Sequence, residues 1–169
     1  MDSPGRDPRP ARSRSRQSFS GHGTRTKVEK DGFGLFIDDT VYTFADISVA
    51  SLPILWIIMV TSPVKYGGVK SAAFIGWMTM VLSAALIRGG WITPFFTKIP
   101  GWVSLSPLLV GLRIIYYNAT LAIVAYSGGW VSTTVQNPLL FLGWSLLVSI
   151  FAIGMFPTIA ERVARWHYQ

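Results

Sequence analysis

Apolar residues gather in four long runs along the chain, and only a few polar side chains interrupt each run. Crossing the ~30 Å hydrocarbon core of a bilayer takes about 20 residues of helix, and each run is close to that length. The pattern predicts an all-α integral membrane protein with four transmembrane helices. The predicted spans are residues 44–62, 69–88, 106–126 and 137–157.

Capping residues and prolines mark the predicted helix ends. Thr43, followed three residues later by Asp46, forms a Thr-x-x-Asp capping box and predicts that the first span begins there. Pro53 lies within this span and lacks a backbone N–H, so it should kink the helix and free a carbonyl one turn earlier. Ser106 and Pro107 predict the start of the third span, because proline is favoured at the first helical position.

The segments outside the spans differ from them in composition. Residues 1–30 are rich in Arg, Ser, Pro and Gly, and we expect this basic tail to be disordered. Residues 31–43 mix aromatic, acidic and glycine residues, which favours a short interfacial lead-in. Residues 89–103 read as an interfacial loop and 127–137 as an uncharged turn, and residues 158–169 form a short basic tail.

Composition supports membrane insertion and excludes several kinds of chemistry. The chain is 50 % hydrophobic and 14 % charged, with a mean hydropathy of +0.41, which is unusual for a soluble domain. It has no cysteine, so disulfides and thiolate chemistry are excluded. Asp38 and Asp39 are adjacent carboxylates without a third ligand at a recognisable spacing. We therefore predict no catalytic residue, no cofactor, no metal site and no enzymatic activity.

The positive charge is unevenly distributed and predicts an orientation. The net charge is +7, and residues 1–30 hold eight of the fifteen basic side chains. Cytoplasmic segments of membrane proteins are enriched in Lys and Arg, so both termini are predicted to be cytoplasmic. For a basic tail beside a bilayer the nearest polyanion is an anionic lipid headgroup, and we expect no binding of nucleic acid.

Arg113 is the one charge well inside a predicted span, and three readings of it stay open. Its long side chain can reach back to the cytoplasmic interface. It can pair with Asp46, which is expected at a similar depth, because an unpaired charge in the bilayer is costly. It can also form an anion site with Tyr117 and Thr120, which share its helix face. Asn118 points elsewhere and is expected to make interhelical hydrogen bonds.

Small residues recur on one face of two spans and predict close helix packing. They are Ala72, Gly76, Thr79 and Ser83 in the second span, and Ser145, Ser149 and Ala152 in the fourth. The sequence thus predicts a structural or accessory membrane subunit that associates with itself or with other membrane proteins. The alternative is a small transporter or channel with a polar path near Arg113, Tyr117 and Asn118.

Overall fold

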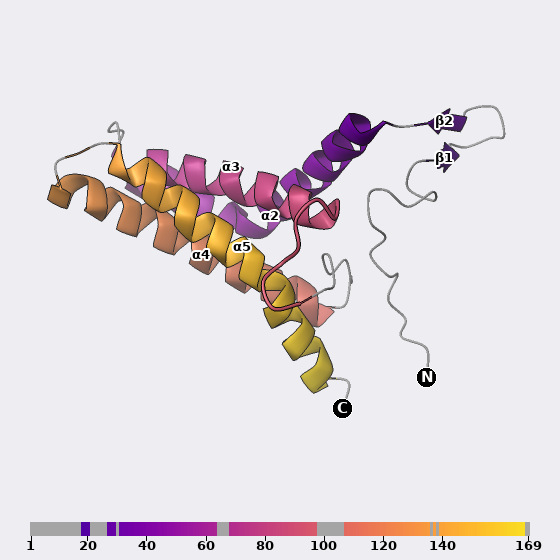
Figure 1. Cartoon of the computed structure of the whole chain (residues 1–169). Coiled ribbons are helices and arrows are strands. Elements are labelled where there is room, and N and C mark those ends of the chain that lie inside the picture. The colour runs from indigo at the N-terminus through magenta and orange to yellow at the C-terminus, as the bar shows by residue number, and fades with distance from the viewer. Residues whose placement is uncertain are drawn as a thin grey trace.

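The computed structural model describes residues 18–20, 27–29, 31–63, 68–97, 107–135, 137 and 139–167. Its helices are α2 (Gly32–Thr61), α3 (Val69–Arg88), α4 (Pro107–Val135) and α5 (Leu140–His167). Two short strands, β1 (Ser18–Ser20) and β2 (Lys27–Glu29), pair antiparallel ahead of α2 (Figure 1). All four helices are long and apolar enough to span a membrane, which confirms the prediction of four such helices.

Little of the predicted disordered tail is described by the structure. The tail residues that it does describe form β1 and β2, with Phe19 opposite Val28, and the sequence did not predict this pairing. The rest of residues 1–30 lie outside the described residues. The predicted contact between this tail and anionic lipid headgroups lies outside them as well.

The first helix begins earlier than predicted, so residues 32–43 are helical and do not form a separate lead-in. Asp31 is the N-cap, and its side chain accepts a hydrogen bond from the Gly34 backbone N–H at 2.8 Å. The capping box at Thr43 was therefore wrong. The Thr43 hydroxyl instead donates to the backbone carbonyls of Asp39 and Val81.

The last two helices are also longer than the predicted spans. The predicted turn at 127–137 was wrong, because α4 continues through Gly128 and Gly129 to Val135. Likewise, α5 continues through Pro157 to His167, so most of the predicted C-terminal tail is helical. In both places tertiary contacts override the local preference of glycine and proline against helix. The bounds of α3 match the predicted second span.

Glycines allow α3 and α4 to pack closely. A Cβ atom on Gly76 would lie 2.5 Å from Val124 Cγ1, and one on Gly128 would lie 2.8 Å from Ala72 Cβ. Both distances are too short for real side-chain contacts, so any larger residue would push the helices apart. Glycine within a helix costs about 0.5–1 kcal/mol relative to alanine. The close contact that it allows is the usual way in which membrane helices associate.

The buried core lies between the helices and is mostly apolar. Its most buried members are Ile47 of α2, Met80 and Val81 of α3, Leu121 of α4 and Ala160 of α5. In contrast, α2 packs against α3 and α4 and leaves much of its outer face exposed. Its first turns extend beyond the other helices (Figure 1).

Candidate functional site

Asp46 and Arg113 form an ion pair between α2 and α4. Arg113 Nη1 donates to Asp46 Oδ1 at 3.2 Å. The exposed fraction of the side chain is 9 % for Arg113 and 37 % for Asp46, so the carboxylate is the more accessible partner. Of the three readings of Arg113, the geometry places it in the pair with Asp46.

The pair lies inside the bundle, near the end at which α3 ends and α4 begins. At ~1.5 Å per residue, Arg113 is roughly 9 Å along α4 from Pro107. Asp46 is about 10 Å along α2 from Asp39, by the same rise, and Asp39 contacts Arg88 at the end of α3. Both charges therefore lie at a similar distance from this end of the bundle. Pairing lowers the cost of keeping either one there.

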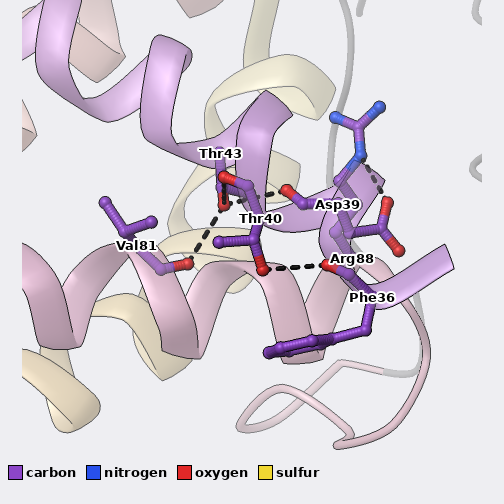
Figure 2. Close-up of polar contacts among 6 residues, drawn as sticks. All are labelled: Phe36, Asp39, Thr40, Thr43, Val81 and Arg88. Carbon is purple, nitrogen blue, oxygen red and sulfur yellow. Dashed lines mark hydrogen bonds and ion pairs between the residues drawn. The ribbon is translucent and has the colours of Figure 1, made fainter. Parts of the chain in front are cut away.

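A second ion pair, between Asp39 and Arg88, was not predicted from the sequence. Arg88 Nε donates to Asp39 Oδ1 at 3.1 Å, and the Asp39 side chain is 1 % exposed. The Arg88 guanidinium also stacks on the ring of Tyr42, 3.9 Å from its centroid. Figure 2 shows this pair beside the Thr43 hydroxyl, which donates to the Val81 carbonyl of α3. These contacts join the first half of α2 to the last turns of α3.

The spacing of the two acidic residues could have revealed this pair. Asp39 and Asp46 are seven residues apart, which places them on one face of a helix about two turns apart. The prediction missed it because residues 31–43 were not assigned to a helix. In the part of the chain that the structure describes, no group of three His, Asp or Glu residues could hold a metal ion.

Asn118 of α4 contacts backbone groups of α2 on both sides of Pro53. In a regular helix the Ile54 N–H would donate to the Ala50 carbonyl. Ile54 N donates to Asn118 Oδ1 at 2.9 Å, and Asn118 Nδ2 donates to the Ala50 carbonyl at 2.7 Å. One side-chain amide thus contacts both backbone groups and joins α4 to α2 around Pro53. Pro53 lies within the continuous helix α2, so the predicted kink stays a prediction.

The same arrangement recurs at Pro157 in α5, where a backbone amide takes the place of Asn118. The Phe95 N–H donates to the Gly154 carbonyl at 3.0 Å. The Thr158 hydroxyl donates to the Phe95 carbonyl. A Cβ on Gly154 would lie 2.5 Å from the Phe95 ring, so glycine is needed for this approach. The loop after α3 is therefore hydrogen-bonded to α5 at the Gly154 carbonyl. In a regular helix this carbonyl accepts from the Thr158 N–H.

The other predicted polar residues of α4 contact the interior of the bundle. Tyr117 is 4 % exposed, and its ring centroid lies 5.1 Å from that of Phe156 in α5. Thr120 is 6 % exposed. Arg113, Tyr117 and Thr120 thus share a buried face of α4. Asn118 reaches α2, as the preceding contacts show.

The small-residue stripes also face the interior. Ala72, Gly76 and Thr79 of α3 are buried, and Ser83 is half-buried. Ser145 and Ser149 of α5 are fully buried, and Ser149 Oγ would be 3.2 Å from a Cβ on Gly76. These residues pack α3, α4 and α5 together within one chain. They are used inside the bundle and are not available to an outside partner.

A groove lies between α2 and α4, and the Asp46–Arg113 pair forms part of its lining. It has a volume of about 480 Å³ and is lined mainly by apolar side chains from 41–50 of α2 and from Val110 to Ile114 of α4. Asp46 and Arg113 are its charged members. Since only two neighbouring helices line the groove, it opens to the side of the bundle.

The comparison with protein families places the four helices in one family. The sequence profile of the family described as a domain of unknown function (DUF8215) matches residues 30–163. The chain belongs to this family. The match begins just before α2 and ends within α5, so it covers α2, α3, α4, most of α5 and the groove. No match was found among curated proteins or among solved structures.

Proposed function

We propose that this chain is a non-enzymatic membrane protein that acts as a structural or accessory subunit by binding a transmembrane helix in the groove between α2 and α4. The observation that carries the proposal is the groove itself. It is apolar and opens to the side, and it contains a carboxylate that is 37 % exposed. A helix laid against it would fill the volume and could supply a hydrogen-bond donor to Asp46.

Lateral association is better supported than transport. A transporter needs polar side chains that face a path through the bundle. Arg113 and Tyr117 are 7 % and 4 % exposed. Asn118 binds two backbone groups of α2. These contacts hold the helices together and favour a structural role for the polar residues of α4.

The proposal is tested by the mass of the protein extracted with its native lipid, without detergent. We expect a particle whose protein mass exceeds the 18.7 kDa of one chain. Ala45 is exposed and lines the groove, so Ala45→Trp should fill the groove and return the particle to the mass of one chain. A matched control is Leu147→Trp, because Leu147 is 69 % exposed on α5, away from the groove.

The control variant should behave as the wild type. A particle of one chain for all three proteins would overturn the proposed function. So would an equal loss of the partner in both variants, because the groove would then have no special part in association.

A further inference from the structure

We infer that the helix bound in the groove is α2 of a second copy of this chain, in a parallel homodimer. This inference rests on the proposed function and names its partner. It is carried by two features of α2, a continuous apolar seam on its exposed face and a donor and an acceptor that lie one turn apart on that face.

The seam consists of six exposed residues at alternating spacings of three and four. They are Tyr42, Ala45, Val49, Leu52, Trp56 and Met59. Side chains at this spacing form the contact line of two helices that cross at a small angle. The opposite face of α2 carries Ile47 and Ile58, each 1 % exposed, and packs against the bundle. The seam is thus the face of α2 that no other helix of the described chain covers.

The first half of the seam runs along the groove. Tyr42, Ala45 and Val49 belong to the seam and also line the groove beside Val110 and Ile114 of α4. A second α2 packed on the seam would therefore contact α2 and α4 of the first copy together. By two-fold symmetry the first α2 would occupy the groove of the second copy.

Tyr42 and Asp46 are complementary across such a dimer. Asp46 offers an acceptor in the groove, and the Tyr42 side chain is 57 % exposed with a hydroxyl that can donate. Two copies of the chain have the same distribution of Lys and Arg, so they insert into the membrane with the same orientation. Their α2 helices therefore run parallel. Tyr42 of each copy then lies about one turn, roughly 6 Å, from the depth of Asp46 in the other. A tyrosine side chain can span that offset, which would give two symmetric hydrogen bonds.

The geometry of the dimer can be tested by single cysteines, because the chain has none of its own. Cysteines at positions 45, 49 and 52 lie on the seam. Phe44 and Ile57 are 46 % and 47 % exposed but lie off it, so cysteines there are matched controls. A disulfide needs Cα atoms about 4.4–6.8 Å apart. Mild oxidation in membranes should therefore give a covalent dimer from the seam positions and much less from the controls.

The Tyr42–Asp46 contact is tested separately by Tyr42→Phe. This variant keeps the ring on which Arg88 stacks and removes only the hydroxyl. Membrane hydrogen bonds average about 0.6 kcal/mol, so losing two predicts a dimer roughly sevenfold weaker. The measurement is energy transfer between labelled copies in phosphatidylcholine vesicles over a range of protein-to-lipid ratios.

Seam-specific disulfides together with weaker association of Tyr42→Phe would support the inference. Equal disulfide yields at seam and control positions would overturn it, because they indicate random collision. An unchanged dimer in Tyr42→Phe would overturn the assigned contact. If the groove binds a different polypeptide and no seam disulfide forms, the homodimer is wrong while the proposed function stands.

Discussion

At the scale of single residues, several polar side chains of the bundle pair with groups on a neighbouring helix. Asn118 is the clearest case, because its amide hydrogen-bonds to two backbone groups of α2, one before and one after Pro53. A buried donor or acceptor left without a partner costs about 1–3 kcal/mol. The Asn118 side chain of α4 therefore serves as a hydrogen-bond partner for the backbone of α2.

Replacing Asn118 by alanine should destabilise the protein by about 2–4 kcal/mol, since two backbone groups would lose their partner. The measurement is reversible unfolding in mixed micelles. In a chain that also carries Pro53→Ala, residue 53 regains its N–H and α2 can close its own hydrogen bonds. The cost of Asn118→Ala should then fall to less than half. Equal costs in the two backgrounds would contradict the role given to Asn118.

The Asp46–Arg113 pair predicts strong coupling between two substitutions. Removing one partner of a fully buried pair costs about 3–5 kcal/mol, and the partly exposed carboxylate of Asp46 lowers this cost. Asp46→Asn and Arg113→Gln should therefore each destabilise the protein, and the double variant should cost clearly less than their sum. Unfolding of the four proteins under one condition measures the coupling. Additive effects would show that the contact contributes no stability.

At the scale of helices, two glycines differ in whether a neighbouring helix packs against them. Gly128 lies against Ala72, whereas a Cβ on Gly143 of α5 would have nothing within 4 Å. Both residues are inside helices, so alanine gains about 0.5–1 kcal/mol of helix propensity at either one. Gly143→Ala should therefore be neutral or stabilising.

Gly128→Ala should be destabilising by at least 1 kcal/mol, in the range of overpacked core substitutions (about 1–3 kcal/mol). Thermal unfolding of the two variants side by side gives the comparison. The account of α3–α4 packing fails if the two substitutions have the same effect.

The positions of the helices could be predicted from the sequence better than their ends. Apolar runs located all four helices, and α3 was placed correctly. The ends of α2, α4 and α5 were missed because Asp39, the Gly128–Gly129 pair and Pro157 look like helix breakers or interface residues. Each helix continues through these residues because of contacts distant in sequence. Asp39 contacts Arg88, and the two glycines contact Ala72 and Val69. Near Pro157, the Phe95 N–H donates to the Gly154 carbonyl.

The polar residues of the candidate site were predictable in part. Depth and opposite charge suggested that Asp46 could meet Arg113, and the spacing of Asn118 suggested an interhelical role. The groove could not be predicted, because it depends on how α2 and α4 diverge. The small-residue stripes were predicted to pack helices closely, and the fold uses them between its own helices.

At the scale of the whole molecule, the distribution of basic residues predicts that both termini face the cytoplasm. Single cysteines in this cysteine-free chain allow a direct test. A membrane-impermeant maleimide added to intact cells should label positions 63 and 137, which follow α2 and precede α5. It should label positions 93 and 166 only after the membrane is permeabilised. Labelling of positions 93 and 166 on intact cells, and of 63 and 137 only after permeabilisation, would contradict the predicted orientation.

The central claim is that the groove between α2 and α4 binds a protein helix. It is tested most directly by a photo-reactive amino acid at position 49, in the groove, activated in native membranes. Val49 is 72 % exposed, and Ile115 of α4, which is 71 % exposed and is not among the groove-lining residues, gives a matched control. We predict an adduct with the mass of a polypeptide from position 49 and only lipid adducts from position 115. Lipid adducts alone at both positions would contradict the claim.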